Sequence, residues 1–381
     1  MSKVFFPNST QFDEMNRHLA DIVAAIASGS QMDLSTWEGV QRAVRLGLAP
    51  KLFPIGTQLV VTRTEGDTES EYLFDVVAHD YYKSVHDETA HTMTLLCHTS
   101  VGSIQFDAPE AFYYAKTELP AGTYNFTIPA DNSAWLAGTY NFTLTKAIPA
   151  GGQLCISAGA GTPMTSCYVV AYGSASSTVD QDYVSIVAGK IGTSLGTFGV
   201  ELNHTSRVAY GSNNYKESVI RQFLNNPSSG GGLTWLPQTK FDRIPSWVEH
   251  TVGFTAGLGA DFLSVVGEVV VPCSANNIYE SPDSTVTKGT KYTVTDKFYL
   301  ASQMEIFGDS NGSVVDGSAL FPYYKGADAA DRVKGVPAQI WWTRTPRDSG
   351  HSSVVYVSAA GGLSTIGAAT AYGVVPACTI V

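Results

Sequence analysis

The alternation of apolar and polar residues predicts short β-strands along most of the chain. The segments 58–63, 71–79 and 91–97 each carry apolar residues at strand spacing, and a Glu-Gly-Asp turn joins the first two. The heptapeptide AGTYNFT occurs at Ala121–Thr127 and again at Ala137–Thr143, and each copy alternates aromatic with polar side chains. Each copy therefore predicts a strand with one buried face.

Three stretches have helical spacing instead. Residues 10–28 place apolar side chains at alternating intervals of three and four, which is heptad spacing. This pattern predicts either an amphipathic helix docked on its own domain or an oligomerisation or attachment helix. Residues 35–47 predict a short helix capped by Ser35, and a third helix begins at Asn214 and ends near Pro227.

Composition and charge narrow the class of protein. The chain has 381 residues, which is enough for two or three domains, and 44% apolar with only 15% charged residues disfavours disorder. A net charge of −11 argues against a nucleic-acid surface. No apolar run reaches the length of a membrane span, and the first residues lack the features of a signal peptide. We therefore expect synthesis in a cytoplasm and no membrane span.

The patterns divide the chain into four segments. Residues 1–50 are expected to form an N-terminal helical attachment or oligomerisation segment, and residues 51–118 the first part of an α+β domain. Residues 119–199 contain the duplicated strand and predict a small all-β insert. Residues 200–381 complete the α+β domain and carry a C-terminal binding region at 341–381.

Metal and thiol chemistry is weakly indicated. His79, His86, His91 and His98 lie within twenty residues, but no compact metalloenzyme spacing is present. Hydrogen-bonded histidines are the simpler interpretation, and no cofactor or metal is expected.

A stretch that includes Asp309, Asn311 and Asp316 is similar to a calcium loop, but Leu320 stands where the bidentate Glu belongs. A plain acidic turn is the alternative. The five cysteines are scattered and never form a CxxC pair, so buried free thiols are expected. Cys155 and Cys167 could instead pair across a hairpin.

The last forty-one residues hold the candidate binding surface. Rigid side chains form a frame at both ends, namely Trp341, Trp342, Arg344, Pro346, Gly373 and Pro376. Small, polar and tyrosine side chains lie between them, and the candidate ligand-binding residues are Asp348, His351, Ser353, Tyr356, Ser358, Ser364, Thr365, Ile366, Gly367, Thr370 and Tyr372. Such side chains on a rigid scaffold are typical of a paratope. A packed or exposed β-meander without a ligand is the alternative.

These motifs resemble a known family. The sequence IWWTRTP, followed by YGVVPA, is similar to the end of C-type-lectin-like domains in bacterial and prophage proteins. The segment YGSNNYKESVIRQFLNN and the strands AHDYY and HTMTL resemble the same family. The resemblance covers most of residues 50–381. It implies an α+β, C-type-lectin-like fold with an N-terminal helical segment and a small all-β insert.

Some of these relatives are variable proteins of diversity-generating retroelements, in which mutagenesis of adenines rewrites codons near the C-terminus. The mixture of side chains between His351 and Tyr372 resembles such a rewritten set. The resemblance also reaches, distantly, the formylglycine-generating enzymes of the sulfatase-modifying-factor branch. Cys273 and Cys378 are the only cysteines near the end, and neither lies in a matching motif.

The resemblance implies ligand binding rather than catalysis. The expected partner is a protein or carbohydrate receptor on a cell surface, met by a protein of a phage tail or another displayed position. A homo-oligomer formed through the N-terminal helix would add avidity. The alternatives are a structural protein that decorates a phage particle without a receptor role and, less favoured, an enzyme of the formylglycine-generating branch.

Overall fold

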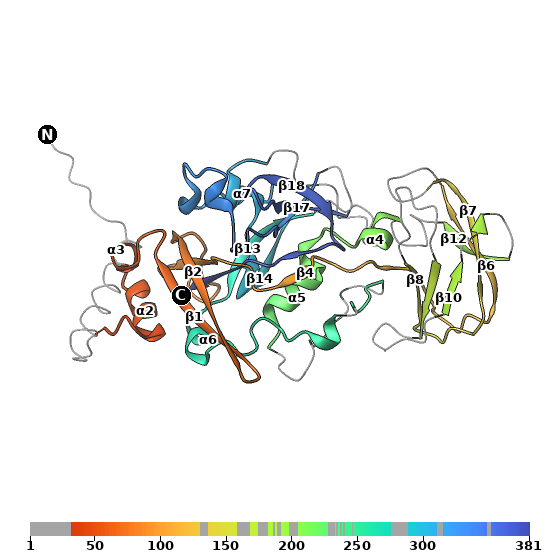
Figure 1. Ribbon diagram of the computed structural model, residues 1–381, viewed down its shortest axis with the longest axis horizontal. Helices are drawn as coiled ribbons and strands as arrows, with labels where there is room; N and C mark the ends of the chain where they lie inside the picture. Colours follow the sequence, from red (N-terminus) through yellow and green to blue (C-terminus); the bar gives the residue numbers. More distant parts are fainter. Residues whose placement is uncertain are drawn as a thin grey trace.

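The protein consists of a β-rich body and a β-sandwich lobe at one end of the long axis (Figure 1). The figure shows a computed structural model, in which the described residues are 32–129, 136–157, 168–173, 182–185, 187–188, 192–197, 205–227, 233, 235–236, 238, 241–245, 247–275, 289–310, 315–348 and 352–381. Within these ranges, no helix has the length and apolar character that crossing a membrane requires.

Most of the regular structure is strand. The strands of the body are β1 (Gln58–Glu65), β2 (Thr68–His79), β3 (Met93–Cys97), β4 (Ser103–Gln105), β13 (Val269–Ser274), β14 (Lys291–Asp296), β15 (Phe298–Leu300), β16 (Trp341–Pro346), β17 (Ser353–Val357), β18 (Leu363–Gly367), β19 (Ala371–Gly373) and β20 (Pro376–Ile380). The strands of the lobe are β5 (Ala111–Tyr114), β6 (Gly122–Ile128), β7 (Gly138–Leu144), β8 (Gln153–Ser157), β9 (Tyr168–Tyr172), β10 (Asp182–Ser185), β11 (Val187–Ala188) and β12 (Thr193–Thr197).

The helices are short. They are α2 (Trp37–Arg45), α3 (Ala49–Leu52), α4 (Thr205–Tyr210), α5 (Val219–Asn225), α6 (Ala260–Val265) and α7 (Gln303–Phe307), with 3-10 turns η1 (Tyr215–Glu217), η2 (Val248–His250), η3 (Pro322–Tyr324) and η4 (Ala330–Arg332). The longest of these has nine residues.

The strands form five sheets in the described part of the chain. The central sheet of the body has the order β1-β2-β3-β20-β15, and the terminal sheet has the order β18-β17-β16-β19-β4. Strands β13 and β14 form a two-stranded ribbon, and the lobe contains the sheets β10-β9-β8-β5 and β11-β7-β6-β12. The terminal sheet therefore joins the last strands of the chain to β4, far away in sequence.

The expected α+β, C-type-lectin-like fold is wrong, because the described architecture is predominantly β with few, short helices. The predicted helix from Asn214 to Pro227 shows why. Asn214 caps only the η1 turn, and the Ser218 hydroxyl starts α5 afresh by accepting a hydrogen bond from the Arg221 amide. Packing of the η1 turn and α5 in the folded protein outweighs the tendency of this segment to form one continuous helix.

The strand predictions are confirmed at several places. Strands β1 and β2 form the expected antiparallel hairpin, with Glu65 opposite Thr68 at its turn. The two AGTYNFT copies form β6 and β7, which pair over seven residues with Asn125 opposite Asn141. The predicted helix of residues 35–47 is present as α2, but the Thr36 side chain, not Ser35, caps it. The helix predicted at residues 10–28 lies outside the described residues.

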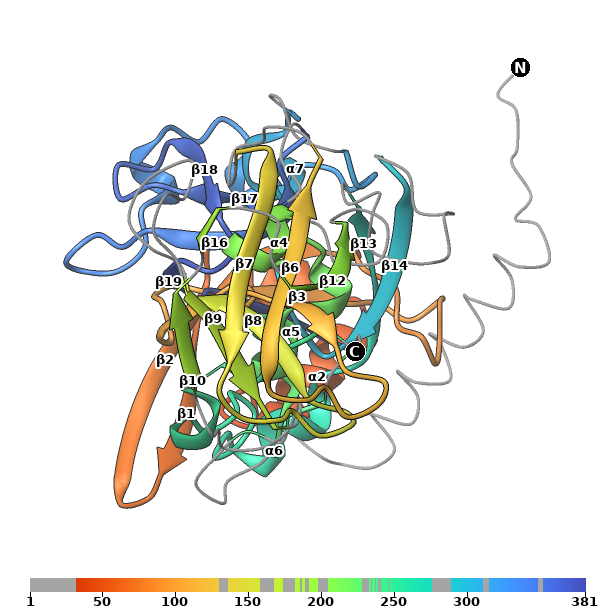
Figure 2. The same cartoon turned by 90° about the vertical axis from the view of Figure 1, so that its right-hand side faces the viewer.

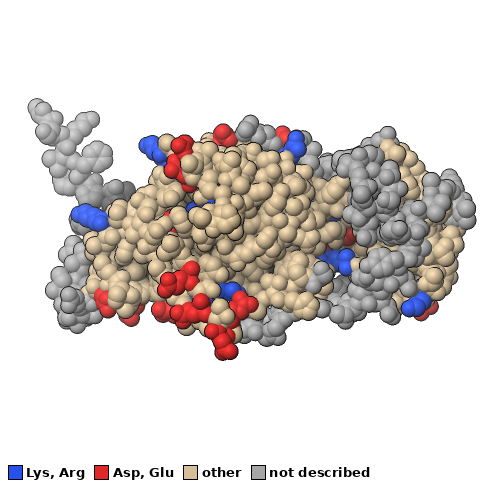
Figure 3. Space-filling model, in the orientation of Figure 1, with Lys and Arg blue, Asp and Glu red and all other residues tan. Residues whose placement is uncertain are grey.

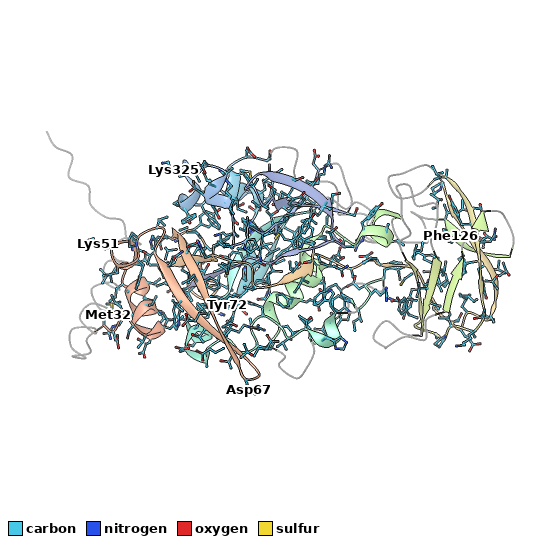
Figure 4. The ribbon with its side chains drawn as sticks, in the orientation of Figure 1. Met32, Lys51, Asp67, Tyr72, Phe126 and Lys325 are labelled. Atoms are coloured by element: carbon cyan, nitrogen blue, oxygen red, sulfur yellow. The ribbon has the colours of Figure 1, made fainter. Side chains whose placement is uncertain are left out.

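The duplicated heptapeptide builds the same local structure twice in the lobe. The Tyr124 hydroxyl donates to the carbonyl of Pro120 over 2.7 Å, and the Tyr140 hydroxyl donates to that of Leu136 over 2.9 Å. On the inner face, Phe126 packs against Phe112 in a core separate from that of the body, as Figure 4 shows by its position in the lobe.

Buried ion pairs connect the lobe to the body. The Arg207 guanidinium on α4 donates to both carboxylate oxygens of Glu110 and lies 3.0 Å from Glu217. Asp107 accepts the Ser212 amide over 2.8 Å. Burial, together with the neighbouring Asp242 and Glu110, raises the pKa of Asp107 well above its ordinary value. This junction is therefore crowded with carboxyl groups around the buried Arg207 guanidinium.

The β1–β2 hairpin extends beyond the body, with Asp67 at its tip (Figure 4). Glu65, Glu69 and Glu71 on this hairpin are also exposed. Figure 3 shows acidic side chains gathered along the same edge, whereas the middle of that face carries mostly uncharged residues. The negative net charge is thus unevenly spread.

A second buried ion pair fixes the loop before the terminal sheet. Lys334 Nζ lies 3.2 Å from Asp75 Oδ2, and only 1% of either side chain is exposed. Asp75 also accepts from Gln58 over 3.0 Å and lies 2.9 Å from His98 Nδ1. Burial alone would raise the pKa of Asp75, but Lys334, His98 and Gln58 together hold this pKa below its ordinary value.

This geometry predicts an acid-dependent effect of Asp75→Asn. At neutral pH the variant should lose about 1.5–3 kcal/mol of unfolding free energy, because the buried Lys334 ammonium loses its counter-charge and bonds to a neutral amide instead of a carboxylate. A lowered folded pKa means that this contribution is complete above the ordinary value of 3.8 and is lost as pH falls through the lower folded value. Urea unfolding of both proteins as a function of pH should show the difference closing only on the acid side. A difference that does not depend on pH would contradict this assignment.

Candidate functional site

The terminal sheet brings two of the candidate residues together. The Tyr356 and Tyr372 rings lie 5.0 Å apart between centroids at an interplanar angle of 67°. The Tyr372 ring also lies 5.1 Å from that of Trp342. Both tyrosines are half-buried. Burial and the neighbouring Tyr356 raise the pKa of Tyr372, so its hydroxyl remains a neutral donor and acceptor near pH 7.

The two tryptophans of the frame hold this sheet from opposite sides. All residues of β16 are buried, and neighbouring side chains of a strand point to opposite faces. The Trp341 indole donates to the carbonyl of Arg332 over 3.1 Å, and the Trp342 indole donates to that of Ile104 over 3.0 Å. The predicted rigid frame is therefore tied both to the preceding loop and to β4.

Arg344 is the electrostatic centre of the frame. Its guanidinium donates to both carboxylate oxygens of Glu305 over 2.7 and 2.9 Å and to Asp316 over 3.1 Å. It also donates to the Leu300 carbonyl over 2.7 Å. Burial alone would lower the pKa of Arg344, but Glu305, Tyr82 and Asp316 raise it well above its ordinary value, so the group stays charged.

A cleft opens at the β4 side of the terminal sheet, between the residues that precede β16, strand β19 and the start of β4. The cleft has a volume of about 360 Å³. Its lining residues are Ser100, Gly102, Ser103, Gln339, Ile340, Ala371, Tyr372 and Gly373. None of them is charged. Small residues, two hydroxyls, a carboxamide and a tyrosine ring therefore surround the space.

Two polar side chains of this cleft are available to a ligand. Ser103 and Gln339 are exposed, and neither side chain bonds to another residue in the described part of the chain. The Ser100 hydroxyl, by contrast, donates to the Gly102 carbonyl over 2.6 Å and accepts the Val374 amide over 3.0 Å. Ser100 thus shapes the wall of the cleft, while Ser103 and Gln339 offer hydrogen bonds.

The other candidate residues do not converge on one surface. Directly paired residues of antiparallel strands share a face, so Ser364 lies beside Tyr356, and Ile366 beside Val354, on one face. Thr365 lies beside Val355 on the opposite face, where it accepts a hydrogen bond from Arg347 over 3.2 Å. The candidate set is therefore divided between the two faces of the sheet.

Several of the remaining candidates have a structural role in turns. The Ser358 hydroxyl accepts the Gly362 amide over 3.1 Å, and the Thr370 amide donates to the Gly367 carbonyl over 3.1 Å. Ser353 pairs with Gly367 at the end of the β17–β18 ladder. Asp348 is half-buried in the connection from β16 to β17, and His351 lies outside the described residues.

Sequence reasoning missed the half of the cleft that other parts of the chain supply. Ser100, Gly102 and Ser103 come from β4 and the loop before it, more than two hundred and sixty positions before Tyr372. Gln339 precedes the frame. Nothing in the local pattern of these small polar residues indicates that β4 completes the terminal sheet. The cleft can be recognised only once the pairing of β4 with β19 is known.

A larger cleft of about 560 Å³ beside α5 is a weaker candidate, because most of its polar groups are already paired. Arg221 donates to both carboxylate oxygens of Asp296, and Gln222 exchanges two hydrogen bonds with the backbone of Leu236. Asn225 likewise exchanges two bonds with the backbone of Phe298. These amides hold the surrounding segments together and leave few groups for a ligand.

The histidines do not converge. His91 Nδ1 lies 3.0 Å from Asp80, His98 bonds to Asp75, and His79 Nε2 lies 3.0 Å from the Phe53 carbonyl. His86 is exposed, 4.0 Å from Glu268. Among the described residues, no group of His, Cys, Asp and Glu is arranged to hold a metal ion.

The described part of the calcium-like loop serves an ion pair, and the described cysteines are the expected buried free thiols. Asp316 pairs with Arg344 and bonds to the Ser318 amide, and Asn311 lies outside the described residues. Cys155 is a buried free thiol, and its suggested partner Cys167 is likewise not described. Burial raises the pKa of Cys273 to about 12 and that of Cys378 well above its ordinary value, whereas a nucleophilic thiol needs a lowered pKa.

One of the three comparisons with known proteins gives a match. A family model described as a domain of unknown function (DUF6273) matches residues 187–381. This range includes the last strands of the body, from β13 to β20, but not β4. No curated protein and no solved structure matches the chain.

Proposed function

We propose that this chain, which belongs to the DUF6273 family, is a ligand-binding protein whose site is the cleft beside Tyr372. The observation that carries the proposal is the meeting of two exposed polar side chains, Ser103 and Gln339, with a rigidly held tyrosine at one cleft. Binding sites commonly combine a shaped apolar wall with a few placed polar groups. Tyrosine adds contact area at little cost in conformational entropy.

The lining points to an uncharged ligand rich in hydroxyl groups, such as a sugar unit of a cell-surface receptor. No lining residue carries a charge, so a charged ligand would find no counter-charge within the cleft. Ser103 and Gln339 can each donate and accept, which matches the hydroxyl groups of a saccharide. The half-buried Tyr372 ring offers a flat apolar wall beside them.

In this proposal the protein recognises a receptor from a phage tail or another displayed position. The proposal takes its support from the resemblance of the terminal motifs and from the candidate residues Tyr356 and Tyr372 beside the cleft. Diversification by a retroelement is a separate part of it. A reverse-transcriptase gene and a template repeat in the neighbouring DNA would support diversification. Without them, the proposal reduces to recognition by a binding surface of fixed sequence.

The experiment compares Ser103→Trp with wild-type protein on an array of immobilised neutral oligosaccharides. The indole should fill the cleft from its exposed rim, and binding should weaken at least about tenfold, which corresponds to roughly 1.4 kcal/mol. The matched control is Thr143→Trp, at an exposed strand threonine of the lobe, and it should bind like wild type. Thermal unfolding checks that both variants fold.

The dependence of binding on salt concentration provides a second measurement in the same experiment. Because the cleft is uncharged, the affinity of wild-type protein should change little as the salt concentration rises. Binding that vanishes at high salt would place the contact on a charged surface instead. Equal binding by Ser103→Trp and wild type would exclude this cleft as the site.

A further inference from the structure

We infer that β18 is an association surface for a second copy of this chain, which adds its own β18 antiparallel across a two-fold axis. Strand β18 is the outermost strand of the terminal sheet and lies at the upper margin of the body in Figure 1, and Figure 2 shows it there from the side. The inference stands independently of the ligand cleft, which lies at the other side of the sheet, among β4, β19 and the residues that precede β16.

The hydrogen-bond pattern shows which backbone groups of β18 point outward. The Ala368 amide donates to the Ser352 carbonyl over 2.8 Å, and the Ser358 amide donates to the Gly362 carbonyl over 2.7 Å. In an antiparallel ladder the hydrogen-bonded pairs recur at every second residue. Ser364 and Ile366 therefore bond to β17, whereas the amides and carbonyls of Leu363, Thr365 and Gly367 point away from it.

These outward groups remain open in the described structure. The Gly367 carbonyl accepts the Thr370 amide over 3.1 Å, and no other described residue bonds to the outward backbone groups of β18. The edge strand β1 differs, because the Thr64 amide donates to the Gly257 carbonyl and the Thr62 carbonyl accepts the Gly259 amide. In the part of the chain that the structure describes, the edge of β18 is covered only beyond its C-terminal end, where the Ala369 amide donates to the Tyr210 carbonyl over 2.7 Å.

Strand β18 also lacks the features by which natural proteins protect an edge. Its sequence LSTIG contains no charged residue and no proline, and its register with β17 runs over five consecutive pairs without a bulge. Charges, prolines and bulges are the usual means of preventing strand addition. The side chains of β18 itself are uncharged and its backbone groups are open, which favours pairing with another strand, and the Arg347 guanidinium beside the Thr365 hydroxyl limits the strength of that pairing.

The edge is complementary to itself. A two-fold axis at Thr365 places Leu363 opposite Gly367 of the second copy, so all three outward residues meet outward residues. The largest side chain among them then faces a residue with none. A Cβ atom at Gly367 would lie 3.1 Å from the Tyr210 Cβ, so Tyr210 fills the space beside this glycine and the incoming leucine has to pack against the tyrosine. Strand and register are therefore consistent with a second copy.

The contact is small, and this predicts weak association. A pairing of two five-residue strands covers much less than the roughly 1,600 Å² of a standard stable interface. Sedimentation velocity of the full chain should therefore show a concentration-dependent equilibrium between species. Thr365→Pro should shift this equilibrium towards the smaller species, because it removes an outward amide from the two-fold contact.

Thr365→Pro tests the contact with the second copy without disturbing the sheet, because the amide that it removes does not bond to β17. Edge strands tolerate proline at positions whose amide points away from the sheet. The thermal midpoint of Thr365→Pro should stay close to that of wild type. Ser364→Pro, which removes an inward amide, should instead lower the midpoint. Thr365→Lys provides a second variant that weakens the same contact by charge and retains the amide.

Site-specific cross-linking separates this edge from association through other segments. The Thr365→Cys variant should cross-link to a second copy with a short bismaleimide, because the axis brings the two positions together. Thr143→Cys and the wild-type protein are the controls, and the described native cysteines are buried. Cross-linking of Thr365→Cys no greater than in the controls, or equal association of wild type and Thr365→Pro, would overturn the inference.

Discussion

Replacing Arg344 by methionine is expected to lower the free energy of unfolding by about 3–5 kcal/mol or more. The substitution removes the guanidinium but keeps the length of the side chain, so it leaves the carboxylates of Glu305 and Asp316 buried without their cation. It also deprives the Leu300 carbonyl of its donor. Chemical denaturation should show a much lower midpoint, and a variant that does not fold would agree with this expectation.

Arg347→Met is the matched control, because Arg347 is exposed and close to the same strand. Its effect should stay within about 0.5 kcal/mol, as for most surface substitutions. Combining Glu305→Gln with Arg344→Met should cost less than the sum of the two single changes, since one of the two carboxylates left without a cation is then neutral. Equal midpoints for Arg344→Met and Arg347→Met would show that the buried network does not stabilise the frame.

Residues near one another in sequence made much of the local structure predictable. The alternation in residues 58–79 specified the β1–β2 hairpin, and the repeated heptapeptide specified β6 and β7. Both are hairpins, in which pairing partners are close in sequence and the alternation of side chains sets the buried face. Arg344, a predicted frame residue, is buried and paired with Glu305.

The predicted fold class was wrong because it depends on contacts between residues that are far apart in the sequence. Helical spacing after Asn214 was strong, but Ser218 divides the segment into the η1 turn and the short helix α5. The order of the terminal sheet depends on β4, and its pairing with β19 joins positions that local patterns cannot connect. The ligand cleft inherits this difficulty, because Ser103 and Gln339 become neighbours of Tyr372 only after the sheet has formed.

The candidate residues also show that amino-acid type alone does not predict which face of a strand a residue occupies. Tyr356 and Thr365 suit a display surface equally well by composition, yet they lie on opposite faces of one ladder. A shift of one residue exchanges the faces of a strand, so the face is decided by register and not by composition. This is why Thr365 serves the edge contact in our inference, while Tyr356 supports the cleft.

Trp342→Ala is the second substitution for which we expect a large effect, about 3–5 kcal/mol of unfolding free energy. The indole is fully buried, contacts the Phe106 ring at 5.7 Å and the Tyr372 ring at 5.1 Å, and donates to the Ile104 carbonyl. Its removal leaves a cavity beneath the cleft and takes one donor from the Ile104 carbonyl on β4. Oligosaccharide binding should decrease together with stability, because Tyr372 loses the ring against which it packs.

Two milder variants separate the contribution of the terminal stretch to stability from its contribution to ligand binding. Tyr372→Phe keeps the ring contacts and removes only the hydroxyl, so it should alter binding more than stability. Thr365→Ser keeps the hydroxyl that Arg347 contacts and should leave the midpoint nearly unchanged. If Trp342→Ala and Thr365→Ser shifted the denaturation midpoint equally, the whole terminal stretch would act as core. A binding role built on a rigid frame would then lose its structural basis, because frame and surface would not be distinct.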